Sequence, residues 1–167
     1  KALIANTATD AGRPGPDYQY GYGIVNAVAA VEALENNWYK LDELTDGQTT
    51  DFKIQVPAGV KELRVMLSWN DPVAKKNYAV GECPLVNDLD LTVTSGSTTV
   101  FPWTLTPALP ETNAVQDKKN DKDPLEQVSI NAPAAGEYIV HVSGSVKQSD
   151  KQPYAIVWYF DKQIPEL

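Results

Sequence analysis

The sequence predicts a mostly β protein, an antiparallel β-sandwich or jelly roll preceded by a short α-helical segment. From about Gln48 onward, apolar residues alternate with polar ones, as in strands that bury one face. Turns that contain Gly or Pro separate these alternating stretches. Before Gln48, apolar residues recur at the spacing of a helix instead. We therefore expect a helical part at residues 1–40 and a sandwich at residues 46–167, joined by a polar connection at residues 38–46.

The first forty residues predict two helical pieces. Residues 1–8 read as the end of one helix, and a loop rich in Gly, Pro and Asp follows. A second helix is predicted at residues 24–34, with an apolar stripe made of Ile24, Ala27, Val28, Val31 and Leu34. Its other positions are mostly Ala, so this helix could be buried on more than one side. We expect its partner, and the packing partner of Gly21 and Gly23, to lie outside this chain.

The strands follow in order, and one face of each sheet is expected to be buried. The stretch 104–125, rich in Pro, Asn, Asp and Lys, predicts a long loop between two of them. The apolar residues that mark the strands are Phe52, Ile54 and Val56; Leu63, Val65, Leu67 and Trp69; Leu89, Leu91 and Val93; a short stretch between Thr98 and Trp103; Val128 and Ile130; Tyr138, Val140 and Val142; and Tyr154, Ile156, Trp158 and Phe160.

Composition narrows the classes of partner. The 167 residues carry a formal net charge of −8, with a pI near 4.6. This acidity disfavours nucleic acid and anionic membranes, and it suits calcium. No apolar run in the sequence is long enough for a membrane span. Cys83 is the only cysteine, which excludes an intrachain disulfide and a cysteine zinc cluster.

Two sets of motifs resemble one family of enzymes. Asn6-Thr7-Ala8, followed by Gly-Tyr-Gly-Ile-Val-Asn at 21–26, resembles the closing helices of a subtilisin-like serine protease catalytic domain. The later motifs resemble the β-sandwich that follows the catalytic domain in some large bacterial subtilases, similar in shape to the P domain of proprotein convertases. They are Leu-Ser-Trp-Asn-Asp-Pro at 67–72, Leu-Val-Asn-Asp-Leu-Asp-Leu at 85–91, Phe-Pro-Trp at 101–103, Glu-Gln-Val at 126–128 and Pro-Ala-Ala-Gly-Glu-Tyr at 133–138.

These resemblances imply a non-catalytic C-terminal fragment of a secreted or cell-surface subtilisin-like serine endopeptidase. Its partners would be the catalytic domain, in the same or an associated chain, and the protein substrates of the parent enzyme. The sandwich would stabilise the catalytic domain or shape substrate access. The alternative is a free-standing jelly-roll module that binds carbohydrate or protein, with Trp103 or Tyr78 as an exposed aromatic platform. Trp69 and Trp158, in register with apolar alternation, are expected in the core.

Catalysis by this chain alone is not expected. A Ser-His-Asp site would have to use His141, the only histidine, and the sequence contains no Gly-Thr-Ser nucleophile motif. Strand parity places His141 on the same face as Glu137, Ile139 and Ser143, opposite the apolar residues. We interpret it as a strand histidine on the more exposed face.

An acidic cluster predicts a structural calcium site. Asp88 and Asp90 are two apart on a strand, so both carboxylates leave the same face, roughly 7 Å apart at the backbone. Calcium takes six to eight oxygen ligands, often on loops at a sandwich edge. The alternatives are Asn-Asp turns that bond their own backbone, or acids that are merely solvated. The candidate ligands, from strand ends and from the loop that follows residue 117, are Asp71, Asn87, Asp88, Asp90, Asp121, Asp123 and Glu126.

Overall fold

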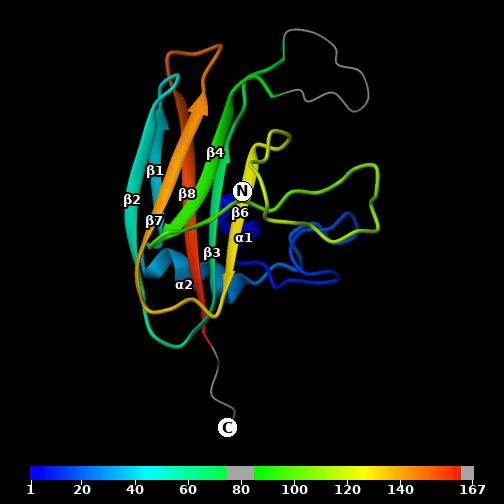
Figure 1. Cartoon of the computed structure of the whole chain (residues 1–167), viewed down its shortest axis with the longest axis vertical. Helices are drawn as coiled ribbons and strands as arrows, with labels where there is room; N and C mark the ends of the chain where they lie inside the picture. Colours follow the sequence, from blue (N-terminus) through cyan, green and yellow to red (C-terminus); the bar gives the residue numbers. More distant parts are fainter. Residues whose placement is uncertain (75–84, 163–167) are drawn as a thin grey trace.

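The computed structural model describes residues 1–74 and 85–162, in which two four-stranded antiparallel sheets pack face to face (Figure 1). The predicted β-sandwich is therefore confirmed. One sheet has the strand order β1-β8-β3-β6 and the other β2-β7-β4-β5. Tyr78 and Cys83 lie outside the described residues. The elements are α1 (Ala2–Asn6), α2 (Ala27–Glu35), β1 (Tyr39–Leu44), β2 (Thr49–Val56), β3 (Val60–Trp69), β4 (Asp88–Ser95), β5 (Thr98–Val100), β6 (Leu125–Asn131), β7 (Gly136–Ser145) and β8 (Gln152–Lys162).

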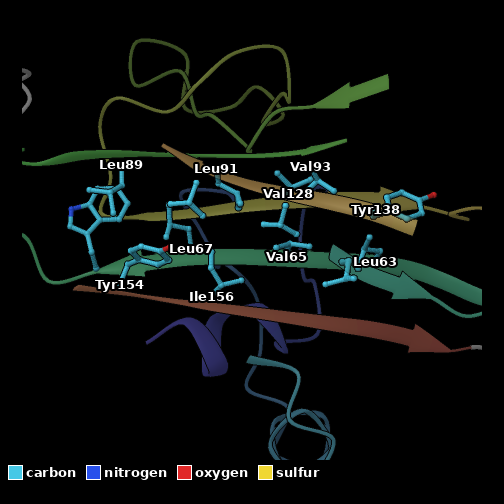
Figure 2. Close-up of a cluster of buried hydrophobic side chains, with 14 of the residues drawn as sticks. Leu63, Val65, Leu67, Leu89, Leu91, Val93, Val128, Tyr138, Tyr154 and Ile156 are labelled. Atoms are coloured by element: carbon cyan, nitrogen blue, oxygen red, sulfur yellow. The ribbon is translucent and has the colours of Figure 1, made fainter. Parts of the chain in front are cut away.

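The core fills the space between the two sheets (Figure 2). Leu63, Val65 and Leu67 of β3 meet the apolar residues of β4 there, and all are completely buried. Trp69 is buried in the same core, and Trp158 packs against it half-buried, as expected. The alternation of apolar and polar residues therefore predicted these strands and their inner faces correctly. A shift of one residue would move every apolar side chain of a strand to the opposite face.

The predicted polar connection at residues 38–46 is wrong, because it contains strand β1. This strand pairs with β8 from Tyr39, opposite Val157, to Leu44, opposite Gln152. In the first part of this strand the polarity is inverted, because Leu41 is 72% exposed whereas Lys40 and Asp42 are half-buried; only Leu44, at its end, is an apolar residue buried on that side. The sequence of β1 lacks a regular alternation of apolar and polar residues, so this strand could not be predicted from it. The strand straddles the boundary between residues 1–40 and 46–167, and the division into two domains stays a prediction.

The expectation that each sheet buries only one face is also wrong for the β1-β8-β3-β6 sheet. Helices α1 and α2 lie on its outer side, so outward-facing residues of β3 are buried as well. Met66 is completely buried and packs against Ala2 and Val157. Arg64 and Ser68, which share its parity, are buried too. The N-terminal segment is thus a third layer on the sandwich.

The second helix begins at Ala27 rather than at Ile24. Asn26 caps it, since its Oδ1 accepts a hydrogen bond from the Ala29 N–H at 3.0 Å. Ile24 instead forms a short bridge with Thr9. Gly23 has a φ of +109°, and a Cβ there would lie 2.2 Å from the Thr9 carbonyl oxygen. The packing partner of Gly23 is therefore Thr9 of this chain, and our expectation of an outside partner was wrong for this glycine.

Candidate functional site

Helix α2 has two apolar faces, and the sandwich covers one of them. Ala29 and Ala33 are buried against Tyr159 of β8 and against Trp38. Glu32, at the border of this face, accepts a hydrogen bond from the Tyr159 hydroxyl at 3.2 Å. Small alanine side chains let the helix approach the sheet closely, so the sandwich supplies one partner of this helix.

The other face of α2 is exposed. Val28 is 81% exposed, Val31 52% and Leu34 47%, and Ile24 and Val25 just before the helix are exposed as well. We call these five residues the α2 apolar surface. Single exposed apolar side chains are ordinary, but Val28, Val31 and Leu34 are three residues apart and follow one side of the helix, which is the kind of surface that marks an interaction site. The predicted apolar stripe exists, and no described residue, in 1–74 or 85–162, covers it.

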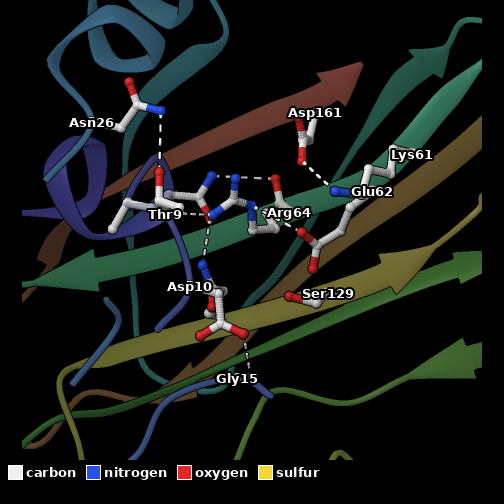
Figure 3. A network of polar contacts seen from close by, with 12 residues as sticks. Thr9, Asp10, Gly15, Asn26, Lys61, Glu62, Arg64, Ser129 and Asp161 are labelled. Atoms are coloured by element: carbon white, nitrogen blue, oxygen red, sulfur yellow. Dashed lines mark hydrogen bonds and ion pairs between the residues drawn. The ribbon is translucent and has the colours of Figure 1, made fainter. Parts of the chain in front are cut away.

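Arg64 holds the N-terminal segment on the sheet (Figure 3). Its Nη1 donates a hydrogen bond to the carbonyl oxygen of Ala8, and its Nε lies 3.4 Å from a carboxylate oxygen of Glu62. The guanidinium also lies over the Tyr159 ring, with Cζ 5.5 Å from the centroid. Burial raises the pKa of the Glu62 carboxyl, and the Arg64 charge opposes that rise. This buried charge network fixes the end of α1 relative to β3 and β8.

Asn6 provides a second attachment. It is completely buried, and its Nδ2 donates to the carbonyl oxygens of Arg64 and Val157 at 3.2 and 3.0 Å. Its Oδ1 accepts from the Gln127 side chain at 3.1 Å. The sequence motif contains Asn6 but does not indicate this anchoring role, and Arg64 belongs to no motif. The signal for Asn6 was its place in the Asn-Thr-Ala motif, whereas Arg64 gave none, because an outward-facing arginine on a strand is usually solvated.

The predicted calcium ligands fall into separate groups. Asp71 and Asn87 are occupied by the backbone of this chain. The Asp71 carboxylate accepts from the N–H groups of Val86 and Asn87, at 2.7 and 2.8 Å. The fully buried Asn87 accepts from the Lys147 N–H and donates to the Gln152 side chain, both at 2.7 Å. These contacts join residues far apart in the sequence, so neither side chain forms the local turn that was the alternative to a metal ligand, and both hold described segments together.

Asp88 and Asp90 lie on the part of β4 that faces Glu126 of β6. Asp88 and Asp90 share the face of β4 opposite Leu89, as predicted. Glu126 is completely buried, and its Oε2 accepts from the Leu91 N–H at 2.7 Å. Among the described residues, Oε1 of Glu126 and Oδ1 of Asp88 are buried without a hydrogen-bond partner. The Lys119 ammonium lies 2.7 Å from the Asp90 carboxylate and supplies a positive charge here.

Burial and neighbouring negative charges raise the pKa values of Glu126 and Asp88. Burial raises the pKa of Glu126 well above its usual range, and the charges of Asp90 and Asp88 add to the rise. Burial, followed by the charges of Asp90 and Asp121, also raises the pKa of Asp88. The group therefore concentrates negative charge in a poorly solvated place.

Asp121 and Asp123 belong to the loop before β6. Asp123 accepts from the Asn120 side chain at 3.1 Å, and Asp121 forms an ion pair with Lys122 at 3.4 Å. Over residues 1–74 and 85–162, no three Asp, Glu, His or Cys side chains are gathered closely enough to hold a metal ion. The seven predicted ligands thus do not form a single preformed metal site in this structure.

Trp103 does not offer a free platform. It is half-buried, and its ring packs against Gly15, where a Cβ would lie 2.9 Å from the indole. His141 lies on the more exposed face of its strand, as predicted. No helix in the described part of the chain is long and apolar enough to cross a membrane.

A family model for the bacterial pre-peptidase C-terminal domain matches residues 48–144, which is more than half of the chain. The chain belongs to this family. Pre-peptidase C-terminal domains are non-catalytic β-sandwiches at the C-terminal side of secreted bacterial peptidases. The match runs from just before β2 into the last residues of β7, and it leaves out the two helices and strands β1 and β8.

Three solved structures are similar to this pre-peptidase C-terminal domain at low identity. They are the Bacillus licheniformis lipase BlEst2 in propeptide form (19% identity, TM-score 0.40), the Aeromonas hydrophila periplasmic inhibitor of g-type lysozyme PliG (14%, 0.38) and a Sulfurospirillum deleyianum protein (8%, 0.35). They cover 75%, 74% and 74% of this chain, which spans 22%, 84% and 99% of theirs. At these scores the similarities carry no functional argument. No curated protein matches the chain.

Proposed function

We propose that this chain is the C-terminal, non-catalytic part of a secreted or cell-surface subtilisin-like serine endopeptidase, and that its sandwich stabilises the catalytic domain. The observation that carries the proposal is the α2 apolar surface. Alanines on one side of α2 pack on the sandwich, while Val28, Val31 and Leu34 on the other side are uncovered. Helix α2 would then be a middle layer, with the rest of the catalytic domain on its free side.

Family membership favours this partner over the carbohydrate-binding alternative. A pre-peptidase C-terminal domain accompanies a peptidase, and residues 1–40 resemble the end of a subtilase catalytic domain. Complete burial of a fully exposed valine or leucine stabilises by about 1.5–3 kcal/mol, so covering Val28 approaches this range and covering the half-exposed Val31 and Leu34 contributes less. Among the described residues, no comparable observation supports glycan binding, because Trp103 is packed against Gly15; Tyr78 lies outside them.

The test is the double variant Val28→Gln, Val31→Gln. In the 167-residue chain we expect it to reduce self-association and dye binding without lowering the melting temperature, since both side chains are exposed. In the longer protein that carries the peptidase domain, we expect the same change to lower the temperature of half-inactivation by several degrees. Leu109→Gln, at an exposed apolar residue in the loop before β6, is the matched control. Equal half-inactivation temperatures for the double variant and the unmodified protein would contradict the proposal.

We also propose that calcium binds at the β4–β6 edge by drawing Asp88, Asp90 and Glu126 closer together than they lie in this structure, with Asp121 and Asp123 contributed by the neighbouring loop. The support is the pair of buried carboxylate oxygens without partners, on Asp88 and Glu126. Burial, together with neighbouring negative charges, raises the pKa of both groups, and a divalent cation would stabilise their charged forms. Lys119 would have to withdraw from Asp90 for the cation to enter, and Asp71 and Asn87 would keep their present backbone contacts.

Calcium titration monitored by melting temperature tests this second proposal. We expect calcium to raise the melting temperature and a chelator to reverse the effect, because a ligand at a hundredfold excess over its Kd stabilises by about 2.7 kcal/mol. Asp88→Asn, Asp90→Asn should abolish the response, whereas Glu35→Gln, at an exposed carboxylate on α2, should preserve it. A melting temperature indifferent to millimolar calcium, together with no heat of binding by calorimetry, would disprove the site.

A further inference from the structure

Three side chains on the outer face of the β2-β7-β4 layer form a hydrogen-bonded chain. Asp51 of β2 lies opposite His141 of β7, and its Oδ1 is 2.7 Å from His141 Nδ1. On the other side of the ring, Nε2 is 2.8 Å from Oγ1 of Thr94 on β4. A hydroxyl, an imidazole and a carboxylate thus stand in the order of a nucleophile, its base and the group that orients the base. All three remain in contact with solvent, since Asp51 is exposed and the other two are half-buried.

We propose that this chain of contacts makes Thr94 a reactive hydroxyl that accepts an acyl group from activated esters. When His141 Nδ1–H donates to Asp51, the Nε2 lone pair faces the Thr94 hydroxyl and accepts its proton. Oγ1 then attacks the ester carbonyl carbon and forms the new C–O bond. The bond to the leaving oxygen breaks with its electron pair, and the proton held on Nε2 passes to that oxygen.

The surroundings restrict this chemistry to a single acylation per chain. The backbone of β4 at Thr94 is paired with Ile139 of β7 on one side and with Thr99 of β5 on the other. Its N–H groups therefore serve the sheet and do not converge on an oxyanion, whose stabilisation is worth about 10²–10³ in rate. Only donors with a good leaving group should react, and the threonine ester should hydrolyse slowly. This inference does not depend on the docking of α2, and it agrees with the non-catalytic character of the family.

The probe is p-nitrophenyl acetate, applied to the 167-residue chain. We expect one acetyl group that maps to Thr94 and is released by hydroxylamine, which cleaves esters and leaves lysine amides intact. Thr94→Ser should keep the ester, and Thr94→Val should lose it. His141→Gln should slow its formation roughly 10²-fold, as expected when a general base is lost. Asp51→Asn should slow it as well, because the ring loses its orienting acceptor.

Thr98→Val, at an exposed threonine of β5, is the control and should react like the unmodified chain. Circular dichroism of each variant verifies that the sandwich is folded. Acetylation of Thr94 that proceeds at the same rate in His141→Gln would overturn the proposal. So would a folded, unmodified chain in which no ester forms at Thr94 under conditions that acetylate its lysines.

Discussion

At the scale of single residues, the Glu126 side chain accepts a β4 backbone hydrogen bond that a neighbouring strand would otherwise accept. Strand β5 pairs with β4 only at residues 93–95 in the described part of the chain, so the Leu91 N–H lies beyond its reach. The Glu126 carboxylate reaches across from the other sheet and accepts that hydrogen. A carboxylate in this position ties the two sheets together at their open edge, but it has to hold its charge in the core, which is costly.

Glu126→Gln tests this account through its pH dependence. The raised pKa means that the folded state favours the neutral acid. The contribution of Glu126 to stability is therefore fully present below the unfolded pKa and declines as pH rises from there toward the folded pKa. In the presence of a chelator, we expect the glutamine variant to match the unmodified protein near pH 4 and to exceed it at pH 7 by about 1–3 kcal/mol. Chemical denaturation at the two pH values measures this, and a variant less stable at both would refute it.

At the scale of elements, the short bridge between Thr9 and Ile24 decides where α2 begins. Gly23 permits the close approach of the two segments, because any side chain there would strike the Thr9 carbonyl. We expect Gly23→Ala to separate the bridge and expose residues 10–22 to limited proteolysis. Gly21→Ala is the control: its φ is also positive, at +61°, but nothing lies within 4 Å of the added Cβ. It should cost only about 1–2 kcal/mol, and equal cleavage of both variants would contradict the steric explanation.

Also at this scale, sequence reasoning succeeded where burial follows one simple period. Leu63, Val65 and Leu67 predict a strand, because successive side chains of a β-strand point to opposite faces and one face of a sandwich sheet is buried. It failed at β1, where Leu41 faces solvent, and at Met66, where a third layer covers the outward side chain. Both failures have one cause. The alternation of apolar residues along one strand does not show which of its side chains a segment distant in the sequence will cover.

At the scale of the whole molecule, the candidate sites show the same limit. The shared face of Asp88 and Asp90 could be predicted, since both lie on one strand. Their proximity to Lys119 and the backbone contacts of Asp71 could not, because loop geometry determines them. The chain from Asp51 through His141 to Thr94 depends on three strands meeting in one register. No periodicity along a single strand specifies that meeting.

The passage from α2 to β1 takes only three residues, Asn36, Asn37 and Trp38. Trp38 N–H donates back to the Ala33 carbonyl at 2.9 Å, and the Trp38 carbonyl accepts from Trp158 N–H at 3.0 Å. A connection this short, with both backbone groups of Trp38 hydrogen-bonded, holds α2 in a fixed orientation relative to β1 and β8. A catalytic domain bound to the exposed side of α2 would therefore tumble in solution as one particle with the sandwich. The rotational correlation time of a label on β5 would then report the mass of the entire particle.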